Sequence, residues 1–229
     1  MDFSQFIPNI ITILEKYWRL FLFEGLKNTL ILTFISVELG TLLGSVVALL
    51  RMSKSRILRF LSSVYIEVIR GTPILLQLYI FYFVLPNVIT FLKLSQFMWV
   101  SIALCVNSAA YVSEVIRSGI QAVDKGQTEA ARSLGMSEGQ TMLRIILPQA
   151  VRYVLPAVGN EFIALLKETS VAGYVAVVDL TRAGNLVRNN THDMFNPLML
   201  IAVTYLVMVV ILTKALGILE RRLAKSDKR

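Results

Sequence analysis

Charged and amide side chains interrupt several long apolar stretches of this 229-residue chain. A charge at the centre of a bilayer costs roughly 2.5–3.5 kcal/mol, so such groups are expected to face a bundle interior or a water-filled cavity. There, a desolvated carboxylate can hold an ammonium or guanidinium group. The pattern therefore predicts that the second, third and fourth apolar stretches line a cavity or pathway. The residues are Glu67, Arg70, Asn107, Glu114, Asn160, Glu161, Lys167 and Glu168.

A polar segment between two apolar stretches has its own local signals. Thr128 is expected to cap a short helix, and Gly135 can close that helix in a left-handed conformation. Ser137 and Gln140 have the spacing of a capping box that begins a second helix, which Pro148 is expected to end. The prediction is two short helices joined at a glycine corner.

The order of residues in this segment resembles the E-A-A-x3-G-x9-I-x-L-P signature of the permease subunits of bacterial ATP-driven importers. The resemblance implies that the loop, at about residues 122–150, lies in the cytoplasm and docks into a separate ATPase subunit. A helical hairpin that merely joins two elements is the alternative. The residues implied to couple the ATPase to the membrane helices are Glu129, Ala130, Ala131 and Gly135.

Other segments are similar to the polar amino-acid branch of these permeases, the histidine, arginine and glutamine types. They are 70–73, 110–114, 155–162 and 166–170, so the resemblance extends over about residues 20–225. One departure is Asp124, where the branch usually has proline, and Asp124 is expected to cap a turn there. The resemblance implies an all-α membrane protein with the type I ABC importer permease fold.

The same resemblance implies a complex of two permease subunits, identical or homologous, with two ATPases and an extracytoplasmic solute-binding protein. This chain has no G-x-x-x-x-G-K-[ST] phosphate loop, so ATP and magnesium are expected to be bound by the partner ATPase. We expect no catalytic residue, metal site or cofactor in the chain itself.

The composition indicates a polytopic membrane protein, with 55% apolar residues and a mean hydropathy of +0.66. We read residues 1–229 as one membrane domain. A helix at 7–23 is expected to lie in the outer interface, and Gly71 and Pro73 are expected to kink the second span. Five spans are predicted, at about 26–50, 60–87, 97–121, 151–178 and 196–219.

The net charge of +8 reports topology rather than a nucleic-acid partner, because most Lys and Arg residues flank the apolar spans. Basic blocks follow the first span, surround the signature loop and close the chain. By the positive-inside rule these regions are cytoplasmic. The N-terminus and the segment 179–196 are then outside a bacterial cytoplasmic membrane.

A solute site is expected near mid-membrane, because an amino acid carries both charges that polar groups there could hold. Glu161 has no obvious cation on its own helix face, since Lys167 is nearly two turns further on. A basic solute such as arginine, lysine or histidine is therefore favoured. An ion pair of Glu161 that only holds helices together is the alternative. The predicted site residues are Asn107, Tyr111, Asn160 and Glu161.

Three other functions compete with this interpretation. An ion-driven secondary amino-acid transporter could use the same carboxylates, although no inverted repeat is visible. An importer permease for another small solute is the second. A membrane-embedded enzyme is the third, but no H-E-x-x-H motif or Cys/His cluster occurs, and His192 is the one histidine.

Overall fold

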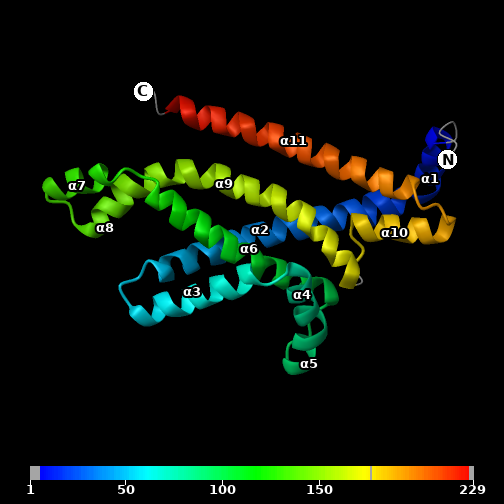
Figure 1. Cartoon of the computed structure of the whole chain (residues 1–229), viewed down its shortest axis with the longest axis horizontal. Coiled ribbons are helices and arrows are strands. Elements are labelled where there is room, and N and C mark those ends of the chain that lie inside the picture. The colour runs from blue at the N-terminus through cyan, green and yellow to red at the C-terminus, as the bar shows by residue number, and fades with distance from the viewer. Residues whose placement is uncertain (1–5, 176, 227–229) are drawn as a thin grey trace. The chain divides into compact units, whose positions relative to one another are not determined.

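The computed structural model describes residues 6–175 and 177–226 (Figure 1). Within them the regular elements are helices, which confirms the all-α class. They are α1 (Phe6–Arg19), η2 (Leu20–Leu26), α2 (Lys27–Arg51), α3 (Arg56–Gly71), α4 (Ile74–Tyr79), η3 (Ile80–Val84), α5 (Leu85–Val88), α6 (Gln96–Gln121), α7 (Lys125–Ser133), α8 (Glu138–Thr141), η4 (Met142–Ile146), α9 (Leu147–Glu168), η5 (Thr169–Val175), α10 (Leu180–Thr191) and α11 (Asn196–Ser226).

Three helical stretches of the described chain are long and apolar enough to cross a membrane. They are Pro8–Arg51, Gln96–Gln121 and Asn196–Leu223, and the broken pair Arg56–Gly71 and Ile74–Val88 would make a fourth. The fourth predicted span corresponds to α9, which carries charged residues along its length and is not one of these. The count of five spans therefore remains a prediction.

Several predicted boundaries differ from the structure. The helix predicted at 7–23 is not separate, because Pro8–Arg51 is continuous through the π-helical turn η2. The predicted kink at Gly71 and Pro73 is a full break, in which Pro73 is extended (ψ 136°) and α4 begins after it. In place of a span over 151–178, α9 begins at Leu147 and gives way to 3₁₀ turns after Glu168.

The contacts group the described residues into two compact units that share the long helices α2, α6, α9 and α11. In the first unit (1–36, 72–105 and 163–212) α10, a helix that the sequence did not predict, begins at the buried residue Asp179. The Asp179 carboxylate accepts hydrogen bonds from the backbone of Thr181 and Arg182 and from the Tyr205 hydroxyl. Thr29 of α2 accepts from the Leu180 backbone. Side-chain oxygens thus anchor the start of α10.

In the second unit (37–71, 106–162 and 213–229) α2 and α6 are in close contact. A Cβ atom at Gly40 would lie 2.7 Å from the Ser108 side chain, and one at Gly44 would lie 2.8 Å from the Ala109 carbonyl oxygen. The small residues at positions 40 and 44 of α2 therefore allow the two helices to pack closely. This contact places the C-terminal half of α2 against the polar residues of α6.

Candidate functional site

The signature segment folds as the predicted helical corner, formed by α7 and α8 at one end of the second unit (Figure 1). Asp124 caps α7, because its carboxylate accepts a 2.6 Å hydrogen bond from the Gly126 backbone. Asp124 thus fills the role predicted for it in place of proline. The prediction of Thr128 as the cap was wrong, because this cap starts the helix one turn earlier.

Gly135 closes α7 with φ of +84°, the left-handed conformation that the sequence predicted. The Met136 backbone N–H donates to the Ala131 carbonyl oxygen, which ties the closing turn to the end of α7. Ser137 and Gln140 form the predicted capping box, in which each side chain accepts from the other residue's backbone N–H. The left-handed glycine, the backbone hydrogen bond that follows it and the capping box together fix the angle of the corner.

Pro148 does not end the second helix, contrary to the prediction. The helix runs from Glu138 through the π-helical turn Met142–Ile146 into α9, with Pro148 in the first turn of α9. A proline disrupts a helix by removing a donor and by clashing with the preceding turn. The wider π-helical turn directly before Pro148 relieves this conflict, so the corner is continuous with α9.

The residues that are predicted to couple the ATPase to the membrane helices differ in their exposure. Glu129 and Ala130 are exposed, as is Gly135, whereas Ala131 is only 4% exposed and packs inside the corner. Leu134 is 84% exposed and was not predicted as a contact residue. A large apolar side chain directly before the closing glycine was the signal that could have identified it. The exposed face is suited to a partner's groove.

One exposed ion pair ties the corner to the loop that follows α2. The Lys54 ammonium donates a 2.7 Å hydrogen bond to the Glu138 carboxylate on α8. This hydrogen bond, together with the attraction of the charge on Lys54, lowers the pKa of Glu138 below its usual value. The pair supports the position of α8, although exposed ion pairs contribute little to stability.

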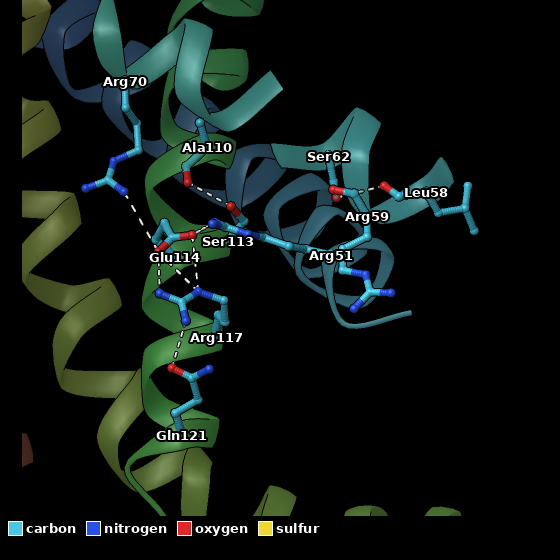
Figure 2. Close-up of polar contacts among 10 residues, drawn as sticks. All are labelled: Arg51, Leu58, Arg59, Ser62, Arg70, Ala110, Ser113, Glu114, Arg117 and Gln121. Atoms are coloured by element: carbon cyan, nitrogen blue, oxygen red, sulfur yellow. Dashed lines mark hydrogen bonds and ion pairs between the residues drawn. The ribbon is translucent and has the colours of Figure 1, made fainter. Parts of the chain in front are cut away.

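In the same unit, three arginines gather around one carboxylate (Figure 2). Glu114 on α6 accepts hydrogen bonds from Arg117, whose Nη2 lies 2.8 Å from Oε2. Arg51, at the end of α2, forms an ion pair with the other oxygen. The Nη1 atom of Arg70, near the end of α3, is 3.9 Å from Oε2 of Glu114. The cluster therefore carries an excess of positive charge.

A cavity of about 440 Å³ lies beside this cluster. It follows the C-terminal half of α6 and is bounded on another side by α9. Its charged lining residues are Arg70, Glu114 and Glu161, and the remaining ones are mostly small. The volume is within the range of small-molecule sites. The cavity is lined by Arg70, Tyr111, Glu114, Val115, Ser118, Gly119, Ala122, Tyr153, Ala157 and Glu161.

The structure brings two of the four predicted solute-site residues to this cavity, Tyr111 and Glu161. Asn107 lies one turn before Tyr111 and is 3% exposed, away from the lining. Asn160 is exposed, and its amide donates to the Pro156 carbonyl oxygen of its own helix. Tyr153 is a lining residue that the sequence reading missed, and we find no local signal that marks it.

Comparison with known proteins identifies the fold and the family. Residues 40–225 match the family described as the binding-protein-dependent transport system inner membrane component. The arginine transport system permease protein ArtQ of Bacillus subtilis (strain 168) is 40% identical over 227 residues, which cover 99% of each protein. The L-cystine transport system permease protein TcyB of the same organism is 38% identical, over 91% of this chain and 88% of TcyB.

Solved structures give the same result. The crystal structure of an amino acid ABC transporter with histidines has a TM-score of 0.86 and 45% identity, and the match covers 91% of this chain and 96% of that one. The inward-facing MetNI methionine ABC transporter, at 20% identity and a TM-score of 0.74, shares the fold.

The chain therefore belongs to the family of binding-protein-dependent transport system inner membrane components. It has the all-helical type I fold of ABC importer permeases, and it is a permease subunit, not an enzyme. The resemblance to the polar amino-acid branch of these permeases, which was inferred from segments 70–73, 110–114, 155–162 and 166–170, is confirmed.

Proposed function

We propose that this chain imports a polar amino acid into the cytoplasm by alternating access, driven by a separate ATPase that docks on residues 129–148. Residues 1–229 form one multi-pass domain of a bacterial cytoplasmic membrane, with α9 as the fourth of five spans, the N-terminus outside and the C-terminus inside. Two ATPase subunits bind ATP and magnesium. A second permease subunit, identical or homologous, and an extracytoplasmic solute-binding protein complete the complex.

The helical corner is the observation that carries this proposal. Its exposed surface includes Glu129, Ala130 and Leu134, and its angle is set by the left-handed Gly135. Because α8 continues through η4 into α9, a push on the corner is transmitted to the helix that carries Glu161. A partner that closes on the corner can therefore move one wall of the cavity.

The cavity supports an amino-acid site built around Tyr111 and Glu161, with Asn107 and Asn160 as the further residues that the sequence proposes. The relatives' names point to amino acids of different character, arginine and L-cystine, and the similar solved transporter was crystallised with histidines. These solutes share an α-ammonium and an α-carboxylate. Glu161 can hold the shared ammonium by charge-assisted hydrogen bonds.

The position of Arg70 changes the argument for a basic solute. A basic solute is favoured if the residues of α9 alone are compared, because this helix has no cation on the same face as Glu161. Arg70 of α3 lines the same cavity, so the site carries both signs of charge. We therefore propose a polar amino acid as the solute, without a preference for basic side chains set by Glu161.

Uptake into proteoliposomes tests the proposed function. The vesicles contain the permease with its co-purified ATPase and solute-binding protein, and the probes are labelled L-arginine and L-glutamine. We expect uptake when ATP reaches the ATPase, and none with a proton or sodium gradient alone. Gradient-driven uptake without ATP would instead support a secondary transporter. ATP-driven uptake of neither amino acid would overturn the proposed solute class.

A further inference from the structure

One of the two carboxylates that line the cavity, Glu114, is held by arginine side chains. Glu114 accepts a 2.8 Å hydrogen bond from Nη2 of Arg117 and two longer ones from its Nε. Glu114 also forms an ion pair with Arg51. A carboxylate that is surrounded by guanidinium groups has little capacity left for a cationic ligand. Glu114 is therefore a poor acceptor for an ammonium, and the other carboxylate of the cavity lining belongs to Glu161.

The Arg70 guanidinium, unlike the Glu114 carboxylate, is accessible to a ligand in the cavity. Its side chain is 43% exposed and lines the cavity. The 3.9 Å separation from Glu114 exceeds the usual hydrogen-bond distance of about 2.7–3.2 Å, so the pair attracts Arg70 without occupying its donors in close bonds. A guanidinium group has five N–H donors in a plane and can bind a carboxylate with two parallel hydrogen bonds.

Two neighbours hold the Arg70 guanidinium in place. Its Cζ atom lies 5.2 Å from the centroid of the Tyr111 ring, which is within the range of a cation–π contact. Glu114 attracts it from the adjacent turn of α6, as Figure 2 shows. Both contacts come from α6, so the helix that forms the cavity wall also fixes the direction of Arg70.

We propose that Arg70 binds the α-carboxylate of the transported amino acid, with Tyr111 and Glu114 as its positioning residues. The proposal rests on the proposed function and extends it, because it assigns the second pole of the solute. With Arg70 at one side and Glu161 at another, the cavity recognises the zwitterionic part that all amino acids share. Side chains of different charge can then be accepted.

Removal of the carboxylate from the ligand tests this assignment directly. The purified permease–ATPase complex is placed in nanodiscs without the solute-binding protein, and binding of two probe pairs is measured. L-Arginine is compared with agmatine, and L-glutamine with 4-aminobutanamide, which each lack only the carboxylate. We expect the wild-type complex to bind the amino acid of at least one pair about 10- to 100-fold more tightly than its partner.

The variant Arg70→Gln is expected to remove most of this difference in affinity. It should weaken binding of the amino acid and leave binding of the decarboxylated probe nearly unchanged. Arg59→Gln is the matched control, because it removes the same charge from an exposed position on the same helix, roughly 16 Å away along its axis. Arg59→Gln should keep the wild-type ratio between the affinity for the amino acid and the affinity for its decarboxylated probe. Thermal unfolding of each complex checks that both variants are folded.

Two substitutions of Tyr111 distinguish a role in positioning Arg70 from a purely structural role. Tyr111→Phe keeps the ring face under Arg70 and should keep the preference for the carboxylate. Tyr111→Leu removes the ring and should reduce that preference several-fold. A purely structural role for Tyr111 would instead weaken both members of a probe pair equally.

Two results would overturn the proposal while leaving the proposed function intact. One is equal binding of both members of each pair by the wild-type complex. The other is a full carboxylate preference in Arg70→Gln. If the wild-type complex binds none of the four probes, the amino-acid site of the membrane domain is itself wrong, and this assignment fails with it.

Discussion

Gly135→Leu is expected to lower ATP-driven uptake at least tenfold while ATP hydrolysis by the assembled complex continues. Gly135 has φ of +84°, and an L-residue in the left-handed region costs about 1–2 kcal/mol. A Cβ at this position would meet no atom within 4 Å, so crowding inside the chain is not the cause. The strain acts on the turn between α7 and α8, and the added side chain stands on the surface proposed for docking.

Gly139 provides the matched control for this variant. It lies on α8, also has open space around it, and has an ordinary helical backbone. Alanine at Gly135 adds only the backbone strain, whereas alanine at Gly139 should be tolerated because it favours a helix. Uptake and phosphate release are measured in the same vesicles. Normal uptake by Gly135→Leu in an intact complex would remove the corner from the coupling mechanism.

Glu161→Gln is expected to reduce the uptake of L-arginine and L-glutamine alike, by about 10- to 100-fold. A hydrogen bond between charged groups is worth about 1.5–3 kcal/mol, and every 1.4 kcal/mol is a factor of ten in affinity. Glutamine keeps the shape and removes the charge. Because Arg70 supplies a positive group in the same cavity, we expect Glu161 to hold the ammonium that both solutes share.

Glu168→Gln is the control, because Glu168 is two turns further along the same helix and is not part of the cavity lining. It should leave both uptake rates close to those of the wild-type chain. If Glu161→Gln lost only the uptake of L-arginine, the result would support the prediction of a basic solute. No loss for either amino acid would exclude Glu161 from the site.

Much of the helical corner could be predicted from the sequence because its signals are local. Gly135, Ser137 and Gln140 act on backbone groups within three or four residues, and each has the predicted role. The two errors have the same origin. General residue preferences favour Thr128 as a cap and Pro148 as a helix end, whereas the cap at Asp124 and the π-helical turn before Pro148 decide the outcome.

The cavity could be predicted only in part, because it depends on contacts between helices that are distant in sequence. Polar residues in apolar stretches identified Arg70, Glu114 and Glu161 as candidates. Their grouping arises from the packing of α2, α3, α6 and α9 within one unit, and α6 contacts α2 through the glycines at 40 and 44. Periodicity on a single helix could not show that Arg70 of α3 lies beside Tyr111.

The central claim, that the α7–α8 corner is the docking site of the ATPase, is tested most directly by cross-linking. Cysteine is introduced at Leu134 in a chain whose buried Cys105 is replaced by serine, and a short thiol-reactive cross-linker is added to the assembled complex. The matched position is Met194, which is 69% exposed in the segment predicted to lie outside. We predict a cross-link to the ATPase subunit from Leu134→Cys and none from Met194→Cys. A complex that hydrolyses ATP but gives no cross-link from Leu134→Cys would contradict the account.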